Sequence, residues 1–498
     1  MRGGLLFRLA AGAALAAVAT TPVHADTLRE ALMKAYKTNP TITGARADLR
    51  ATDENVPIAR SNGVPSLNGT SGYQETLITP TNSFLAPPRQ VTAGVQLSVP
   101  VFQGGAVKNA VRAAETRVQA GRAGLRSTES DLFTQVVGAY MDVIRNAAVV
   151  RLNEQNVHVL DVNLNATQDR FEVGDLTRTD VAQSKARLAQ ARGQLRDAQA
   201  QLIDARENYI NLVGEAPTDL QDPPQLPNLP DHVEVAVDTA LRENPQLVRA
   251  RETLKAAGYD VDAAKAGKLP TLSVTVGGQY YNYLGSLPAL ASQQGVDNAG
   301  KAASAGLTLT LPIFQGGRPA AQVRQAKARE GQAIEQATAA ERQVVDNTRS
   351  AYAAWQSSLY LIRSSRATVE ANQLSLEGVR AENSVGTRTI LDILNAEQEL
   401  LNSQVQLVTA QRNAYVAGFA LLAAMGKAEA SDLGLDGGGL YDPTTYYNDV
   451  RGSIWDWKEG KDPVPIATTT TQTPAQSSDV KPLGENETLD LGVGDAGE

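Results

Sequence analysis

The chain has 498 residues and a formal net charge of −8, from 46 Lys and Arg against 54 Asp and Glu. An acidic chain without a basic stripe is a poor match for nucleic acid, and no nucleic-acid partner is expected. Cysteine is absent and histidine occurs three times, which excludes thiol catalysis and metal clusters of the Cys/His kind. Aromatic residues make up 5% of the chain, so its composition favours long Ala-rich helices over a large globular core.

Residues 1–25 have the pattern of a secretory signal peptide. Arg2 and Arg8 supply the positive start, a short apolar run follows, and Ala25 is the small residue that a signal peptidase needs. A membrane anchor is the alternative, but about ten apolar residues are too few to cross a bilayer as a helix. No cysteine follows the expected cleavage site, which excludes lipoprotein acylation. We therefore expect an exported protein.

The rest of the chain contains one unit twice. Val99–Gly105 (VPVFQGG) returns as Leu311–Gly317 (LPIFQGG), a shift of 212 residues. Upstream, Asn39-Pro40 returns as Asn244-Pro245 at a shift of 205. A unit of about 200 residues has therefore been duplicated, and the fold must be interpreted as two tandem repeats. The expected organisation is repeat 1 over 26–221, a Pro-rich linker over 222–230 and repeat 2 over 231–427.

Each unit holds two segments in which apolar and small polar residues alternate. This period, with many β-branched residues, predicts one β-hairpin per unit, at about 66–99 and 271–311. A soluble, half-buried sheet is one alternative. Because the mature chain lacks an apolar run of about 18 residues, a membrane-inserted form would have to be a β-barrel. Four strands cannot close a barrel around a lumen, since small closed barrels have about eight, so such a chain must oligomerise.

A proline and a Gly-Gly pair follow each second strand, and a long helical stretch begins there. The stretches at 105–213 and 317–425 each break once and return with a strict seven-residue repeat, which predicts coiled-coil hairpins. Shorter helices are expected before each first strand, and their summed length suggests a wall in which long helices lie beside stacked short ones. The expected strand-to-helix joints are Pro100, Gly104, Gly105, Pro312, Gly316 and Gly317.

The pattern fails after Gly426. Residues 428–460 mix aromatic and polar side chains, and we expect this segment to pack on the helices. Residues 461–498 are rich in Thr, Pro, Ser, Asp and Glu, a composition that predicts a disordered acidic tail.

Together with this organisation, the sequence SVGTRTILDIL at 384–394 resembles the TolC family of outer-membrane channel proteins over about residues 26–426. The resemblance implies an α+β membrane protein that forms a homotrimer. Four strands per chain would make a twelve-stranded outer-membrane β-barrel in contact with lipid, continued by a periplasmic α-helical coiled-coil barrel. It also implies the outer membrane of a Gram-negative bacterium, a periplasmic membrane-fusion adaptor, and an inner-membrane ABC or proton-driven transporter as partners.

In that family, acidic side chains ring the constricted periplasmic end of the tunnel. The resemblance places Asp180 and Asp392 there, with Asn395 where the best-known member has a second aspartate. Arg388 matches an arginine that latches neighbouring coiled coils in the closed state. The remaining latch positions are Arg178 and Thr179 in the first unit and Asn383, which replaces a family tyrosine. The residues alone also allow an aspartate favoured by a helix dipole and an arginine that is an ordinary surface charge.

No catalytic triad, zinc-binding pattern or phosphate loop occurs, because the Gly-Gly pairs lack the Lys-Ser/Thr of a P-loop. We therefore expect no enzyme activity and no cofactor. The sequence favours a passive exit duct for protein or small molecules, with a slight preference for type I secretion. A non-transporting periplasmic coiled-coil spacer is the alternative.

Overall fold

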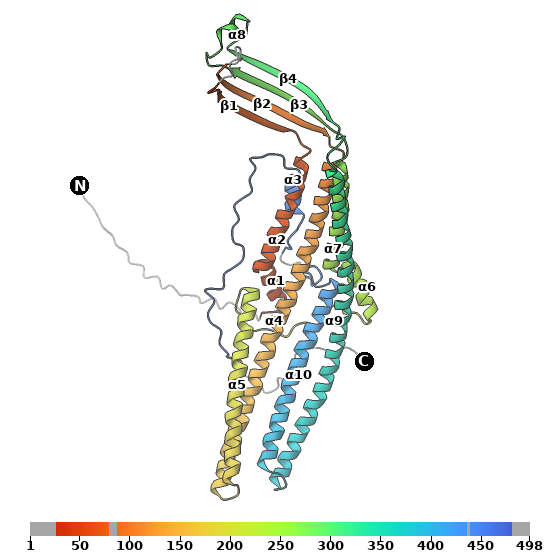
Figure 1. Ribbon diagram of the computed structural model, residues 1–498. Coiled ribbons are helices and arrows are strands. Elements are labelled where there is room, and N and C mark those ends of the chain that lie inside the picture. The colour runs from red at the N-terminus through yellow and green to blue at the C-terminus, as the bar shows by residue number, and fades with distance from the viewer. Residues whose placement is uncertain (1–25, 79–86, 436–438, 481–498) are drawn as a thin grey trace, which may run out of the picture.

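The computed structural model describes residues 26–78, 87–435 and 439–480. The molecule is elongated: a β-sheet lies at one end, and two helical hairpins extend from it to the other end (Figure 1). The expected signal peptide lies outside the described residues. The elements of repeat 1 are α1 (Leu28–Thr38), α2 (Pro40–Asp53), α3 (Asn55–Ser61), β1 (Ser66–Glu75), β2 (Arg89–Phe102), α4 (Ala106–Glu172) and α5 (Arg178–Val213).

Repeat 2 follows the same plan. Its elements are α6 (Val233–Glu243), α7 (Pro245–Ala266), β3 (Thr271–Asn282), the short α8 (Ala289–Gln293), β4 (Ala299–Thr310), α9 (Arg318–Ser384) and α10 (Ile390–Met425). A last short helix, α11 (Thr445–Val450), follows the second repeat.

The four strands form one antiparallel sheet in the order β1-β2-β3-β4, so each repeat contributes one hairpin and β2 pairs with β3 across the repeats. Most of its side chains are exposed or half-buried on both faces. Within the described residues, β1 and β4 are each paired along one side alone. In the described part of a single chain, the sheet therefore has two open edges, at β1 and β4, and neither of its faces is covered. Such a sheet is unstable in water.

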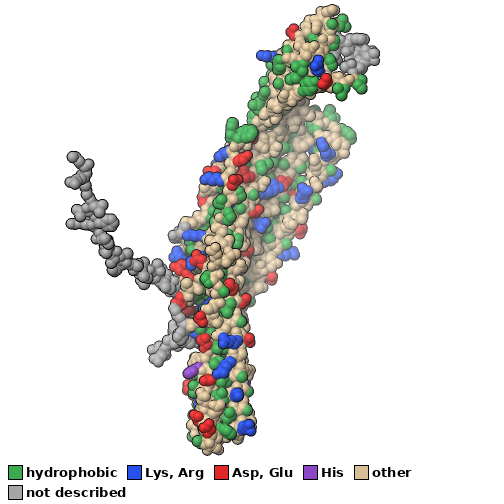
Figure 2. Space-filling model, turned by 90° about the vertical axis from the view of Figure 1, so that its left-hand side faces the viewer, with side chains coloured by type: hydrophobic (Ala, Val, Ile, Leu, Met, Phe, Trp, Pro, Cys, Tyr) green, Lys and Arg blue, Asp and Glu red, His purple; other side chains and the backbone are tan. Residues whose placement is uncertain are grey.

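The charged residues of the strands occur only where the strands meet the loops. Glu75 lies opposite Arg89 at that end of β1 and β2, and Lys301 lies near the corresponding end of β4. The surface between the loops and the helices is apolar or weakly polar on the face shown in Figure 2. Leu67, Val95 and Leu307 are examples of apolar side chains that are more than half exposed.

The strand-to-helix joints differ from the sequence prediction in one respect. Pro100 was expected to follow the strand, but β2 continues to Phe102 and the pairing with β3 shifts between Pro100 and Phe102. A proline lacks an N–H, so a β-bulge is one of the few places where a strand accepts it. Pro312 does follow its strand, because β4 ends at Thr310.

Each Gly-Gly pair makes a turn of defined conformation. Gly104 and Gly105 have φ angles of +62° and +85°, and Gly316 and Gly317 have +61° and +78°. Two consecutive left-handed residues would be strained for any residue with a Cβ. These turns redirect the chain from the sheet into α4 and α9.

The long helices lie beside shorter ones that are stacked end to end. The 67-residue α4 is about 100 Å long and contacts α5 over its lower half and α2, α3 and α7 over its upper half. In the same way, α9 contacts α10 below and α7 above. The largest cluster of buried residues joins α1, α4, α5 and α10 near the middle of the molecule.

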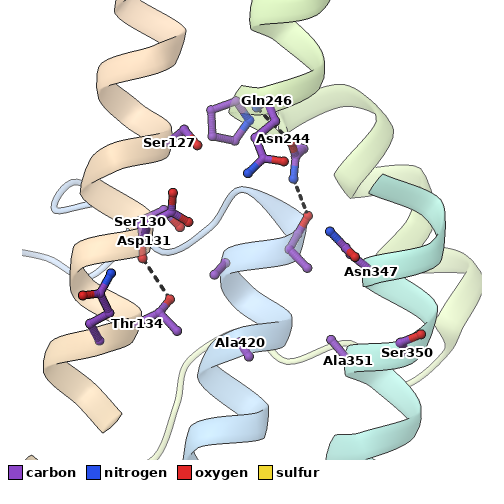
Figure 3. A pocket seen from close by; sticks show the side chains of 14 residues that line it. Ser127, Ser130, Asp131, Thr134, Asn244, Gln246, Asn347, Ser350, Ala351 and Ala420 are labelled. Carbon is purple, nitrogen blue, oxygen red and sulfur yellow. Dashed lines mark hydrogen bonds between the residues drawn. The ribbon is translucent and has the colours of Figure 1, made fainter. Parts of the chain in front are cut away.

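One asparagine joins three helices at the corresponding place in each repeat. Asn39 donates its backbone N–H to Ala35 O at the end of α1 (2.9 Å), and its Oδ1 accepts from the N–H of Thr41 in α2 (2.8 Å). Its Nδ2 donates to Leu212 O at the end of α5 (2.9 Å). Asn244 makes the equivalent bond to Ala424 O in α10 (2.8 Å), which is drawn in Figure 3. The repeated Asn-Pro pair therefore fixes where the short helices meet.

The segment after repeat 2 packs on the helices over part of its length. Ala428, Ala430 and Leu435 are buried in the main core. Ala430 N–H donates to the Glu129 carboxylate (2.6 Å), and Arg126 binds Glu429 (2.7 Å).

The sequence predicts a disordered tail from residue 461, whereas the structure shows contacts between part of this tail and α5. The backbone oxygens of Ser477 and Asp479 accept hydrogen bonds from Arg206, and the Gln476 N–H donates to Glu207 (3.2 Å). The end of the described chain therefore lies along α5, because its backbone groups find charged partners there. Residues 481–498 lie outside the described residues.

Among the described helices, none has both the length and the apolar content that a membrane-spanning helix needs.

We predict that Asn39→Ala lowers the free energy of unfolding by about 2 kcal/mol, because it removes an N-cap and a buried cross-helix hydrogen bond. Asn39→Asp keeps an oxygen for the cap but loses the donor to Leu212 O, so it should be destabilising too. Thermal unfolding followed by circular dichroism measures both changes. A variant at Asn62, which is an exposed residue beyond α3, serves as the control. Unchanged unfolding of Asn39→Ala would contradict this role.

Candidate functional site at the coiled-coil tips

The candidate site residues lie where the two helical hairpins turn, at the end farthest from the sheet (Figure 1). The first turn joins α4 to α5 through residues 173–177, and the second joins α9 to α10 through residues 385–389. Gly174 and Gly386 both have a φ angle of +84°, so each turn uses a left-handed glycine just after a long helix ends.

Both candidate aperture aspartates belong to capping boxes. The Asp180 Oδ2 accepts from the backbone N–H (2.9 Å) and the hydroxyl (2.7 Å) of Thr177, and the Asp180 N–H donates back to that hydroxyl (3.3 Å). Asp392 and Thr389 repeat this arrangement with the same three distances. Each aspartate therefore helps to start the returning helix, which is the structural role that the residues alone allowed.

The same hydrogen bonds keep these carboxylates charged. Bonds from the Thr177 side chain and then its backbone lower the pKa of Asp180 below its ordinary value. The backbone N–H of Thr389 and then its hydroxyl lower the pKa of Asp392. Hydrogen bonding to the charged form explains both directions, so two negative charges remain at the tips at neutral and mildly acidic pH.

Arg388 is bound within its own hairpin. Its Nε donates to the Glu382 carboxylate at 2.7 Å, which raises the pKa of the guanidinium. The Asn383 Nδ2 donates to the backbone oxygen of Arg388 at 2.7 Å. The structure therefore brings the candidate latch residues Asn383 and Arg388 together. It adds Glu382, which the sequence analysis missed.

The first hairpin has a corresponding ion pair with the charges exchanged. Arg170, in the last turn of α4, contacts Asp175 in the turn at 2.6 Å. Arg170 and Glu382 are equivalent under the shift of 212, but Asp175 is equivalent to Thr387 and not to Arg388, so the repeat alone predicts neither pair. Arg178 and Thr179 are exposed at the start of α5.

Asn395 lies between the two hairpins. Its side-chain oxygen accepts from Arg187 Nη2 in α5 at 2.8 Å. Beside it, the buried Leu394 packs with Leu160 and Leu188 of the first hairpin. In a single chain, Asn395 therefore connects α10 to α5.

Hollows of the described structure lie between its helices and on its sheet. Figure 3 shows one between α4, α7, α9 and α10, where the small and polar side chains of Ser127, Asp131, Gln246 and Asn347 line the space. No cluster of His, Cys, Asp or Glu within the described ranges could hold a metal ion.

The comparisons with known proteins assign the chain to a family. The model of the outer membrane efflux protein family matches residues 31–215 and 236–427, which is most of both repeats. The chain belongs to the outer membrane efflux protein family. Consequently it is an export channel of the Gram-negative outer membrane whose helices extend into the periplasm, and the family is one of channels rather than of enzymes.

Individual relatives support this assignment. The chain is 35% identical to the outer membrane efflux protein BepC of Brucella suis, over 86% of this chain and 91% of that protein. It is 26% identical to the outer membrane protein TolC of Escherichia coli, over 82% and 84% of the two chains. Among solved structures, the outer membrane protein VceC of Vibrio cholerae has a TM-score of 0.69 and 22% identity, over 80% of this chain and 96% of that chain. The resemblance to the TolC family inferred from the sequence is confirmed.

We predict that Arg388→Ser and Glu382→Gln loosen the second turn to a similar extent, because each breaks the same ion pair. Hydrogen–deuterium exchange should be faster over residues 384–392 in both variants, and Asp175→Asn should have the matched effect on the first turn. Faster exchange in Arg388→Ser with no change in Glu382→Gln would show that the arginine acts on a group outside its own hairpin.

Proposed function

We propose that three copies of the chain assemble into a closed channel-tunnel that forms the exit duct of a tripartite export system. In this assembly, β4 of one chain pairs with β1 of the next, so three sheets make a twelve-stranded barrel. The helical hairpins of the three chains form the tunnel wall. The cargo is a small molecule or a protein that an inner-membrane transporter delivers through a periplasmic adaptor.

The two open edges of the sheet carry this proposal. In the order β1-β2-β3-β4, β1 runs away from the helices and β4 runs back toward them, so β4 can meet β1 of a neighbouring copy in antiparallel pairing. Closure removes both edges, and the position of strand charges at the loop end leaves an uncharged band for lipid. A periplasmic spacer, the alternative from the sequence, would leave these edges and this apolar surface in water.

The unequal burial of the two long helices supports the same assembly. The two helices have equal length, yet α4 has buried residues along most of its length whereas α9 has few. Tyr360 and Leu374 of α9 are more than two-thirds exposed. In its own chain α9 contacts α6, α7 and α10, and the helices of the next copy would bury the side chains that these contacts leave exposed.

Disulfide cross-linking tests the closure, and the absence of native cysteine makes the experiment clean. A cysteine at Thr70 of β1 is combined in turn with one at Ala302, Ser304 or Gly306 of β4. We expect at least one pair to give covalent dimers and closed trimers on denaturing gels, because one of these registers must bring the strands together. The control is Thr70 with Gly94, which are paired within one chain and should cross-link as a monomer. Monomers from every combination would contradict the assembly.

The tips form the periplasmic aperture in this proposal. Three copies of Asp180 and Asp392 would give the constriction a negative potential, and charged rings of this kind favour cations. Asn395, Arg388, Arg178, Thr179 and Asn383 would contribute to the aperture or to contacts that hold it closed. This role is supported by the two carboxylates, one at the turn of each hairpin, which both remain charged.

We predict that Asp180→Asn with Asp392→Asn reduces the cation preference of the channel in planar bilayers. Asparagine is chosen over alanine because its side-chain oxygen can still accept the capping hydrogen bonds, so charge is removed while the helix starts are kept. Asp442→Asn is the matched control, since Asp442 also accepts bonds from a nearby threonine but lies near the other end of the helices. Unchanged selectivity in the double variant, with assembly intact, would exclude these carboxylates from the pore.

A further inference from the structure

The turn after α11 exposes two tryptophans. Ile454, Trp455 and Trp457 are 73%, 70% and 83% exposed, and Lys458 N–H closes the turn by donating to Trp455 O at 3.2 Å. The third tryptophan of the chain, Trp355, instead packs beside Tyr352 in α9, with ring centroids 6.0 Å apart. Large apolar side chains gathered at one exposed turn are typical of a surface that meets another phase or molecule.

The base of this turn is held firmly against the helices. Tyr446 donates its hydroxyl to Glu54 (2.6 Å), and Arg60 Nη1 donates to Arg451 O (2.8 Å). The Tyr447 ring lies near the guanidinium groups of Arg122 and Arg451, at 5.1 and 5.7 Å. The tryptophans are therefore held on a fixed support, and both side chains remain largely exposed in the part of the chain that the structure describes.

The support lies directly below the sheet. Arg60 is in the last turn of α3, and β1 begins at Ser66. In Figure 1 the segment that follows the second repeat lies beside α3, just below the sheet, and then runs down along the outside of the helices. Ile58 of α3 and Leu67 of β1, which flank the junction, are also more than 60% exposed. The turn is thus placed where a sheet embedded in the membrane would give way to the periplasmic helices.

We propose that Ile454–Trp457 is an interfacial anchor that binds the phospholipid surface of the periplasmic leaflet of the outer membrane. The indole rings would lie at the boundary between headgroups and acyl chains, which is where tryptophan concentrates in membrane proteins. Lys458 and Lys461 lie among Asp456, Glu459 and Asp462, so the charges of this segment nearly balance and the lipid contact depends on the indole rings. The inference rests on the proposed insertion of the sheet. It assigns a lipid contact to a part of the chain outside both repeats.

Quenching by brominated phospholipid tests the anchor. Trp355→Phe leaves the two tryptophans of the turn, and Trp455→Phe with Trp457→Phe leaves Trp355 alone as the matched control. Each full-length variant is reconstituted in phosphatidylcholine vesicles with and without bromine in the upper acyl chain. We expect bromine to reduce the emission of Trp355→Phe about twofold and to leave that of the control variant nearly unchanged, because interfacial indoles contact lipid directly.

Channel conductance of the same vesicles, together with the mass of the detergent-extracted protein, distinguishes a failure of the anchor from a failure of the proposed assembly. If channels form and Trp355→Phe is not quenched by bromine, the anchor is excluded while the export function stands. A blue-shifted emission of Trp355→Phe that does not respond to bromine would place the tryptophans against a neighbouring protein chain, and would overturn the proposal as well. Wild-type protein that shows no conductance and has the mass of a single chain in detergent would instead contradict the proposed assembly.

Discussion

The structure depends on covering two continuous helices of 67 residues along their whole length. A helix of about 100 Å cannot bury its apolar stripe in one compact core, so partners must follow it from end to end. No single returning helix does this, since α5 and α10 have 36 residues each. Over the upper half of the molecule, α2, α3 and α7 cover α4, and α7 also covers α9. Asn39 and Asn244 fix the points where the short helices meet the ends of α5 and α10.

Because the unit is duplicated, the two repeats of one chain make contacts with each other. In the chain, α7 of repeat 2 covers α4 of repeat 1, and β3 pairs with β2. The equivalent partners of α9 and β4 would belong to a third repeat, and the described residues contain two. Equivalent helices therefore have unequal environments: α4 has many buried residues and α9 has few. The closed ring of copies that we propose would remove this inequality without any new type of contact.

The aspartates at the tips have a structural role that is independent of the proposed aperture. Asp180 and Asp392 recur because each starts a helix with a capping box, and that role alone accounts for their position and their lowered pKa. The proposed role in the aperture would add to this one, since the Oδ2 hydrogen bonds preserve the negative charge. An alanine substitution would remove the capping oxygen together with the charge. An asparagine substitution would remove the charge and keep an oxygen for the cap.

The sequence by itself determined the repeats, the alternating strands and the long helices, because these follow from local periodicities and from turn residues such as the Gly-Gly pairs. It also led to the family through the tip motif around Arg388. Tertiary structure decided the features that need partners distant in sequence. Pro100 lies inside β2 because β3 can pair with a bulged strand, and Asn395 accepts a hydrogen bond from Arg187 because α5 and α10 lie together. Residues 476–479 lie along α5 because Arg206 and Glu207 bind their backbone, which composition could not reveal.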